Sequence, residues 1–380
     1  MFSTRRITTA EGQDTRPQRS PAFLVMVLFA LSSLLILLTG CGTSKSTITA
    51  PVAQAQSMRQ VQVYLAPAPT ISTTVRTAQR RLYLFSQTNV GLMQLAVDAQ
   101  GTVCVGEMHA NRLGCLNSRT GVVTSWTPPD AQYGIMTTII DAQGNAWFAE
   151  QNANYIGRFD KRQQTFRTFP LGAWKGAPLG PQDLQFDDRG FLWFTAAEGG
   201  AIGRLDPGTG AIRVWPVPSS PSTLTVTPTG RVWFGADGAI GNLDPLTGQV
   251  TLYDLPNPQA QVFSMATDAT GHLWFTEVLP GKLGMFDPTT STLTELSVPT
   301  LSGEGPPALY ELVIDHQENI WFVDVGANTL VRYAPGKHSL TFFRLSLPGS
   351  APFGLTLDPA GKLWFTVGGS PANYVGEMAP

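Results

Sequence analysis

The sequence has few charged residues, cysteines and histidines. Asp, Glu, Lys and Arg make up 14% of its 380 residues, against about 25% in an average domain, and its formal net charge is −2. Residues 81–380 contain no long Lys/Arg run, which argues against nucleic acid as a partner. The three cysteines and four histidines have no metal-site spacing, and neither a Gly-rich phosphate loop nor a Ser-His-Asp arrangement is evident.

A short aromatic phrase recurs along the chain. It reads Gly-His-Leu-Trp-Phe-Thr-Glu at residues 271–277. Its tryptophan recurs at Trp147, Trp193, Trp233, Trp274, Trp321 and Trp364, and a degraded first copy has Cys104 in that place. The steps between these positions are 43, 46, 40, 41, 47 and 43 residues. Repetition at this period indicates a propeller or a solenoid.

Each copy contains four short β-type runs joined by turns rich in Gly, Pro, Asp and Asn. Four antiparallel strands per copy predict an all-β, seven-bladed propeller over residues 81–380. Adjacent Trp and Phe side chains point to opposite faces of a strand, and both faces of a blade are buried. The glycine of the following Ile-Gly-Arg run, such as Gly203, is expected to leave room for the Trp or to relieve a bend.

The last copy ends after its third strand, at residues 372–378. Residues 81–87 precede the first blade and have the pattern of an unpaired strand, so we expect them to complete the last blade and close the ring. Cys104 and Cys115 fall on neighbouring strands of the first blade. They form either a disulfide or two buried thiols, and the sequence leaves both readings open.

The first 41 residues have the order of a secretion signal. Four arginines lie before an apolar run at 22–38, and Leu-Thr-Gly-Cys follows, ending at Cys41. This resembles the lipobox of bacterial lipoproteins, which implies lipidation of Cys41 and anchoring at the extracytoplasmic face of the cell membrane. An uncleaved membrane anchor and a plain secretory signal are the alternatives. Residues 42–80 are predicted to be a flexible tether, in which 61–65 could form a stray strand.

The repeat resembles that of the virginiamycin B lyase family. The resemblance covers residues 89–380 and lies in the Gly-x-Leu-Trp-Phe-Thr-Glu phrase, followed by Asn-x-Ile-Gly-Arg and Asp-Pro-x-Thr-Gly. It implies a seven-bladed propeller and an enzyme that opens the ester ring of type B streptogramins by elimination. It also implies magnesium, two histidines near the starts of innermost strands in the last two blades, and two glutamates of the last blade that help to hold the metal.

This chain departs from that pattern at each matching position. The two histidine positions, eleven residues before the Trp, hold Tyr310 and Phe353, and the two glutamate positions hold Ala351 and Gly368. Of the four, only the tyrosine could act as a weak base. The resemblance therefore extends to the architecture and not to the acid–base set.

The same position can be followed around the ring. It is occupied by Met93, Met136, Gln182, Ser222, Phe263, Tyr310 and Phe353. Five of the seven are apolar or aromatic, which predicts a mouth suited to an apolar or ring-shaped ligand. Plain packing around a narrow channel is the alternative reading.

A set of acidic residues three positions after the Trp leaves a second function open. It comprises Glu107, Glu150, Glu277 and Asp324. These residues are expected to make structural hydrogen bonds, or to form a carboxylate ring for Mg or Ca as in the similar regucalcin and gluconolactonase propellers. In that case Tyr310 or His109 would move the proton.

Two function hypotheses follow. The first is a lipid-anchored, monomeric binding propeller, with the membrane as one partner and an apolar or cyclic ligand as the other. The second is a metal-dependent lyase or lactone hydrolase with a rearranged site.

Overall fold

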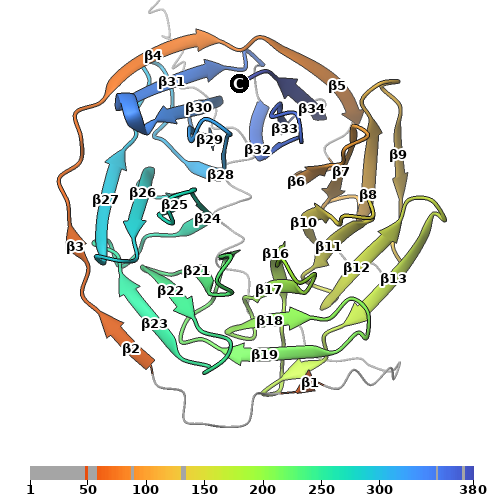
Figure 1. Cartoon of the computed structure of the whole chain (residues 1–380). Helices are drawn as coiled ribbons and strands as arrows, with labels where there is room; N and C mark the ends of the chain where they lie inside the picture. Colours follow the sequence, from red (N-terminus) through yellow and green to blue (C-terminus); the bar gives the residue numbers. More distant parts are fainter. Residues whose placement is uncertain (1–47, 50–57, 87–89, 130–133, 348–349, 370–372) are drawn as a thin grey trace, which may run out of the picture. The chain divides into compact units, whose positions relative to one another are not determined.

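Each copy of the repeat folds into one blade. The computed structural model describes residues 48–49, 58–86, 90–129, 134–347, 350–369 and 373–380, all within the compact unit Gly42–Pro380. Their strands form seven blades around a central axis (Figure 1). This confirms the predicted seven-bladed propeller. The signal segment and Cys41 lie outside the described residues.

In every blade the first strand lies nearest the axis and the next ones follow outward. Blade 1 comprises β6 (Leu92–Val97), β7 (Thr102–Glu107), β8 (Arg112–Asn117) and β9 (Val123–Trp126). Blade 2 comprises β10 (Ile135–Ile140), β11 (Ala146–Glu150), β12 (Tyr155–Asp160) and β13 (Thr165–Pro170). Blade 3 comprises β16 (Pro181–Phe186), β17 (Leu192–Ala196), β18 (Ala201–Leu205) and β19 (Ile212–Pro216). Blade 4 comprises β20 (Thr223–Val226), β21 (Val232–Ala236), β22 (Ala239–Leu243) and β23 (Val250–Asp254).

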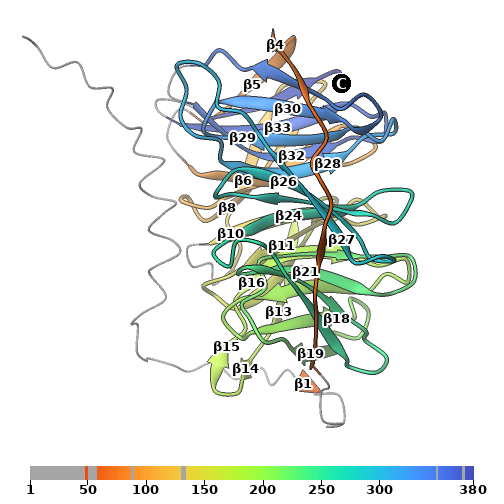
Figure 2. The same ribbon diagram turned by 90° about the vertical axis from the view of Figure 1, so that its left-hand side faces the viewer.

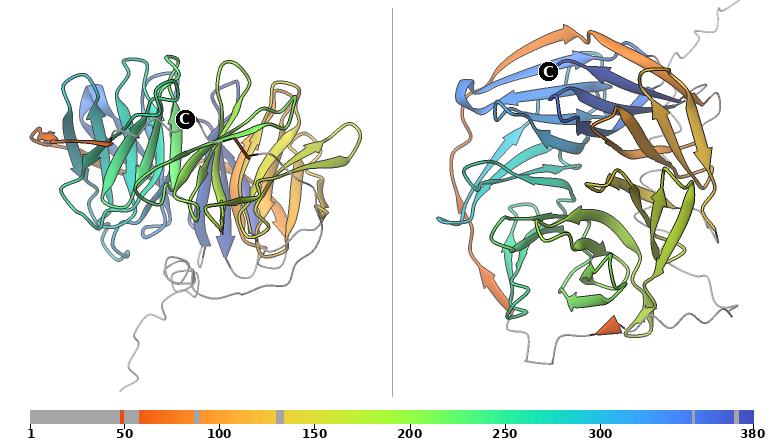
Figure 3. Two further views of the ribbon diagram at one scale, coloured as in Figure 1. Left: turned by 90° about the horizontal axis from the view of Figure 1, so that it is seen from below. Right: turned by 45° about the vertical axis from the view of Figure 1, so that its right-hand side comes forward.

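The remaining blades repeat the arrangement, and Figure 3 shows successive sheets standing side by side. Blade 5 comprises β24 (Val262–Thr267), β25 (Leu273–Glu277), β26 (Lys282–Asp287) and β27 (Thr292–Ser297). Blade 6 comprises β28 (Leu309–Ile314), β29 (Ile320–Asp324), β30 (Thr329–Ala334) and β31 (Ser339–Arg344). Blade 7 comprises β32 (Ser350–Leu357), β33 (Leu363–Gly369), β34 (Asn373–Met378) and β5 (Arg80–Ser86).

The connections between blade strands contain a hairpin and a 3-10 turn. A short hairpin joins β14 (Ala173–Trp174) to β15 (Ala177–Pro178), and the 3-10 turn η1 spans Pro335–Lys337. Among the described residues no helix has the length and apolar character needed to cross a membrane.

Strand β5 closes the ring, as predicted. It pairs antiparallel with β34, with Leu84 opposite Tyr374. Its Tyr83 ring stacks on Trp364 of blade 7, with 6.0 Å between centroids, and the Tyr83 hydroxyl donates to the carbonyl oxygen of Ser118 in blade 1 over 3.1 Å. The strand therefore connects the last blade to the first.

The segment before β5 differs from the predicted flexible tether. Its described part contains β1 (Ile48–Thr49), β2 (Met58–Val61), β3 (Tyr64–Leu65) and β4 (Ser72–Thr77). They pair parallel with the outermost strands of blades 3, 4, 5 and 6 in turn, and the orange trace in Figure 2 follows them across the blade edges. Main-chain groups make these ladders, so a polar composition does not prevent them. We call β2, β3 and β4 the edge belt.

The repeated aromatic pair fills both faces of the sheet in blades 2 to 7. In blade 3, Trp193 is 2% exposed and Phe194 is fully buried. The Trp193 indole nitrogen donates to Oδ2 of Asp187 over 2.8 Å, and the same bond recurs in blades 2, 5, 6 and 7. The recurring Asp before each turn therefore satisfies the buried indole N–H.

The glycine of the Ile-Gly-Arg run serves the Phe and not the Trp, which corrects the sequence-based expectation. Gly203 lies directly opposite Phe194, and a Cβ there would overlap the Phe194 ring. The same holds for glycine and Phe in blades 2, 4, 5 and 7. A strand glycine here marks close approach of a neighbouring side chain.

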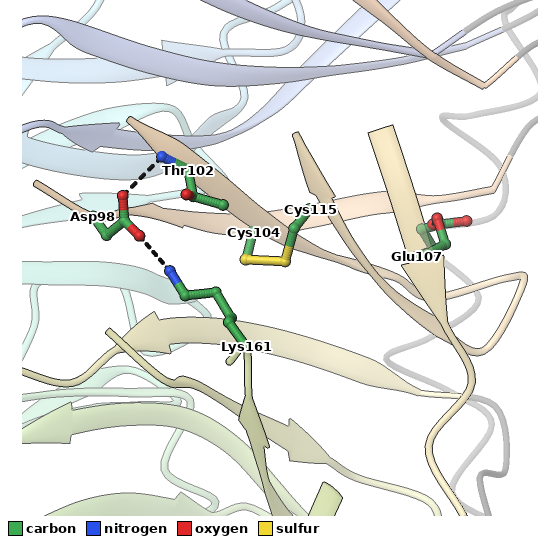
Figure 4. The surroundings of a disulfide bond; sticks show 7 residues. Asp98, Thr102, Cys104, Glu107, Cys115 and Lys161 are labelled. Carbon is green, nitrogen blue, oxygen red and sulfur yellow. Dashed lines mark hydrogen bonds and ion pairs between the residues drawn. A yellow bond between two sulfur atoms is a disulfide. The ribbon is translucent and has the colours of Figure 1, made fainter. Parts of the chain in front are cut away.

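Blade 1 has a disulfide where the other blades have tryptophan. Cys104 and Cys115 are directly opposite on β7 and β8, and their sulfurs are bonded (Figure 4). Asp98 Oδ1 accepts from the Thr102 amide over 2.7 Å, as the equivalent Asp does in blades 2 and 3. Its Oδ2, which has no indole to accept from, pairs with Lys161 of blade 2. This ion pair connects blades 1 and 2.

The inner strands share a bulge near their first residues. The register slips there in every blade except blade 4, for example between Pro181 and Leu184. In blade 3 the Thr195 hydroxyl accepts from the Asp183 amide over 2.9 Å, and Thr276 and Thr366 make the equivalent bond in blades 5 and 7. Bulges re-aim side chains, so these threonines fix the residues nearest the axis.

Candidate functional site

Three of the predicted mouth residues meet one another. Phe263, Tyr310 and Phe353 come from the inner strands of blades 5, 6 and 7. Their ring centroids lie 4.7 Å apart for Phe263 and Tyr310, 5.4 Å for Phe263 and Phe353, and 5.2 Å for Tyr310 and Phe353. We call these residues the aromatic trio. Mutual ring contact across three blades gives a continuous apolar cluster on the inner strands.

The other four predicted mouth residues do not join this ring contact. Met93 is 4% exposed, and the Ser222 hydroxyl donates to the Val262 carbonyl oxygen over 2.5 Å. Met136 and Gln182 are partly buried at the starts of β10 and β16. The structure thus places the aromatic part of the predicted mouth on one side of the axis.

The positions that the family resemblance assigns to acid–base groups lie close together. Tyr310 touches Phe353, and Ala351 lies directly opposite Gly368 in the β32–β33 pair. Ala351 and Gly368 provide no carboxylate, so this pair does not fit a magnesium ion held by two glutamates. These two residues therefore support no catalytic step that uses a bound metal ion.

Tyr310 is poorly suited to act as a base. Burial raises the pKa of its hydroxyl above the usual value, so the tyrosinate that could accept a proton is rare near neutral pH. Tyr310 therefore remains a packing and contact residue of the trio.

His109, the other candidate for proton transfer, lies in blade 1. Its amide donates to the Val90 carbonyl oxygen over 2.9 Å, and its ring lies against Gly91, where a Cβ would crowd Nδ1 at 2.8 Å. Burial lowers the pKa of His109. The ring contacts of the aromatic trio do not include this residue.

The four acidic candidates for a metal ring lie in four separate blades, each at the end of its second strand and fully buried. Glu107 accepts hydrogen bonds from Arg112 Nε over 3.0 Å and from the Ser125 hydroxyl. Asp324 Oδ1 accepts from the amides of Ala308 and Ala327 over 3.1 and 3.3 Å.

Glu150 and Glu277 are less well satisfied. Burial raises the pKa of each carboxyl to about 8, and neither carboxylate oxygen of either residue has a hydrogen-bond partner within the described ranges. Burial also raises the pKa of Asp324, to about 6. In the part of the chain that the structure describes, no three Cys, His, Asp or Glu side chains are grouped to hold a metal. The four acids are thus not brought together as a ring.

Two acids near the axis, the buried Glu311 and the partly buried Asp183, were missed by sequence reasoning. Asp183 and Glu311 lie one residue after the ring positions Gln182 and Tyr310. Strict alternation along a strand assigns consecutive residues to opposite faces. A prediction that places Gln182 and Tyr310 toward the axis therefore places the residues that follow them away from it. The residues after the seven ring positions are Gln94, Thr137, Asp183, Thr223, Ser264, Glu311 and Gly354. Asp183 and Glu311 are the two acids in this otherwise uncharged set of seven, and this pattern is visible in the sequence.

Comparison with known proteins agrees with this architecture. The chain is similar to the structure of a catalytically inactive virginiamycin B lyase from Staphylococcus aureus with quinupristin, at 23% identity over 80% of this chain and 99% of that one, with a TM-score of 0.70. It is similar to a streptogramin B lyase structure at 25% identity, over 79% and 97% of the two chains, with a TM-score of 0.69. A YCF48 structure bound to D1 peptide is 12% identical over 81% and 98%, with a TM-score of 0.64.

No curated protein matches the chain. The model of the virginiamycin B lyase family matches residues 79–374, which is more than half of the sequence. The chain therefore belongs to the virginiamycin B lyase family.

Proposed function

We propose that this protein is a binding member of its family that holds an apolar or cyclic ligand at the propeller axis without opening it. The aromatic trio carries the proposal, because Tyr310 and Phe353 occupy the positions where the resemblance expects histidines. The edge-on and tilted rings of the trio offer a large apolar contact area at low entropic cost. Ala351 and Gly368, at the two metal positions, offer no charged group.

The proposed location is the extracytoplasmic face of the membrane, with a lipid on Cys41. The order of charged start, apolar run and Leu-Thr-Gly-Cys supports this, and so does the Cys104–Cys115 disulfide, since such bonds persist in oxidising compartments. Labelled fatty acid should be incorporated by the wild-type chain and not by Cys41→Ser. Equal labelling of both would contradict the anchor.

Quinupristin, the compound named with the Staphylococcus aureus relative, is a suitable probe for ligand binding. The full-length chain in detergent would be titrated with quinupristin in the presence of Mg²⁺, and the compound would then be analysed by chromatography, because elimination leaves its mass unchanged. We expect binding without ring opening. Phe353→Ala should weaken binding roughly tenfold, whereas Glu150→Gln, a buried residue that the trio does not contact, should leave it unchanged.

The alternative is a metal-dependent lyase or lactone hydrolase with a rearranged site, and family membership favours it. The same experiment separates the two functions. Ring opening of quinupristin that is abolished by a chelator, or metal-dependent turnover of a simple lactone, would replace the binding function by catalysis. Absence of both binding and turnover would contradict both functions for this class of ligand.

A further inference from the structure

The edge belt carries a large share of the exposed apolar side chains. Of the eight large apolar side chains that are exposed in the described residues, four stand on the belt: Met58, Tyr64 and Leu65 are 65%, 65% and 64% exposed, and Val75 is 46% exposed. The three strands follow one another along one side of the ring, over blades 4, 5 and 6 (Figure 1). Apolar side chains that gather on one side of a domain mark an interaction surface, whereas single scattered ones do not.

The segment that contains the belt has only basic charged residues. Residues 42–86 contain five Lys and Arg and no Asp or Glu, whereas residues 87–380 contain sixteen Lys and Arg and twenty-five Asp and Glu. The body of the propeller therefore has a formal net charge of −9, and the segment before it has one of +5. An anionic surface is repelled by the body as a whole and attracted on the side where the belt lies.

Two arginines of the belt are available to a partner. Arg59 and Arg76 are exposed, and neither forms an ion pair with any acid in the described ranges. Asp254, at the end of the strand beside β2, instead accepts a hydrogen bond from Gln60. Arg81 of β5 differs, because it pairs with Glu377 over 3.5 Å. The two belt charges thus remain uncompensated by the chain.

Covalent geometry keeps this side of the ring near the proposed anchor. Cys41 precedes Ile48 by seven residues, and Ile48 pairs with Ile212 on the outermost strand of blade 3. Seven residues span at most about 25 Å, so a lipid on Cys41 would hold the rim of blade 3 within about that distance of the bilayer. The belt begins on the adjacent blade 4. The rim that carries the belt is therefore the part of the propeller that the anchor brings to the membrane.

The side chains of this rim suit the surface of an anionic bilayer. Methionine and leucine side chains enter the boundary between headgroups and acyl chains, and tyrosine is favoured at the level of the headgroups. Arginines bind the phosphates of anionic lipids. An acidic protein would also satisfy Arg59 and Arg76, but it would not account for an apolar set at the membrane end of the chain.

We propose that the edge belt docks the propeller on its rim against the bilayer, with Met58, Tyr64 and Leu65 in the headgroup region and Arg59 and Arg76 on anionic phospholipids. The inference rests on the proposed membrane location and adds an orientation to it. A ring that stands on its rim leaves both ends of its axis open to solution, so a ligand reaches the aromatic trio without passing through the membrane.

The test compares two kinds of vesicle. The full-length chain is reconstituted on vesicles of phosphatidylcholine alone or of phosphatidylcholine with phosphatidylglycerol, and its side chains are oxidised by hydroxyl radicals and analysed by mass spectrometry. Val122 is the internal reference, because it is 59% exposed and lies in blade 1, three steps around the ring from blades 4 and 5. Oxidation of Met58, Tyr64 and Leu65 relative to Val122 should fall at least roughly threefold on the anionic vesicles.

The double variant Arg59→Gln with Arg76→Gln tests the charges. Each arginine near an anionic surface changes the docking equilibrium roughly fivefold, so this variant should lose the protection of Met58, Tyr64 and Leu65. Arg119→Gln with Arg162→Gln is the matched control, since it removes two exposed arginines from blades 1 and 2 and should keep that protection. Both double variants should melt with the wild-type chain, because exposed arginines without ion pairs contribute little to stability.

Several results would overturn the docking surface. Equal oxidation on the two kinds of vesicle would exclude recognition of anionic lipid, and an equal fall at Val122 would mean general shielding by the vesicle. Protection that survives in the Arg59 and Arg76 variant would exclude the proposed contacts. Protection by polyglutamate without vesicles, but not by the anionic vesicles, would assign the belt to an acidic protein. Fatty-acid labelling of Cys41 tests the proposed location separately, so a labelled chain whose belt is not protected would overturn the docking alone.

Discussion

Gly203 lies directly opposite Phe194 in blade 3, and a methyl group at Gly203 would occupy the space of the Phe194 ring. Phe194 is fully buried, so the ring cannot move aside without disturbing the faces of the neighbouring blades. The glycine is therefore part of the packing of the Trp-Phe phrase.

Gly203→Ala should destabilise the protein by about 1–3 kcal/mol, the usual cost of overpacking a core. The measurement is the free energy of unfolding in urea. Gly336→Ala is the control, because a Cβ there meets open space and its effect should stay within about 0.5 kcal/mol. Equal effects of the two substitutions would show that Phe194 has room.

The fold could be predicted because its main feature is periodic. A Trp-Phe pair every 40 to 47 residues and the missing fourth strand of the last copy together imply seven blades and closure by residues 81–87. Of the edge belt, only a possible strand at 61–65, which overlaps β2 and β3, was predicted from the sequence, and β4 left no comparable pattern. All six residues of β4 are exposed, and a strand held by main-chain bonds alone has no apolar alternation to detect.

Burial raises the pKa of Glu150 to about 8 from an ordinary value of 4.5, which makes stability depend on pH. The folded state holds the proton more tightly, so this contribution is complete below about pH 4.5 and is lost as the pH rises through about 8. The melting temperature of Glu150→Gln should therefore rise relative to that of the wild-type chain between pH 5 and pH 9. The difference should grow by on the order of 5 °C.

Melting curves at several pH values provide the measurement. Glu277 and Glu311 titrate in the same range, so the wild-type curve will fall for several reasons and only the difference between variant and wild type is diagnostic. A melting-temperature difference between variant and wild type that stays constant with pH would contradict this prediction. It would mean that the Glu150 carboxyl has a hydrogen-bonding partner in solution that stabilises its charged form.

The candidate site could be predicted only in part. Reading one position around the ring identified the aromatic trio, because Phe263, Tyr310 and Phe353 stand at equivalent places in three consecutive blades. Asp183 and Glu311 were missed because the bulge breaks the two-residue alternation on which the reading depended. The four acids after the Trp were expected to make structural hydrogen bonds or to form a carboxylate ring, and spacing alone does not contain the three-dimensional geometry that keeps them in separate blades.

The Cys104–Cys115 disulfide joins adjacent strands of blade 1, in which Cys104 stands where the other blades have the repeated tryptophan. Replacing both cysteines by serine should cost about 2–4 kcal/mol of unfolding free energy, since the bond closes a short loop in the unfolded chain. Dithiothreitol should lower the melting temperature of the wild-type chain and leave that of the double variant unchanged. A wild-type chain indifferent to reductant would indicate two buried thiols.

Strand β5 is expected to contribute more to stability than the edge belt, because β5 has side-chain contacts in two blades. Phe85 is 8% exposed and lies against Gly114 of blade 1, while Tyr83 stacks on Trp364 of blade 7. Deleting residues 81–87 should therefore lower the melting temperature sharply and broaden the transition. Replacing residues 72–77 by a Gly-Ser stretch of equal length removes only an exposed strand and should lower it by a few degrees. If the two changes had equal effects, closure of the ring through β5 would not be the main source of its cooperativity.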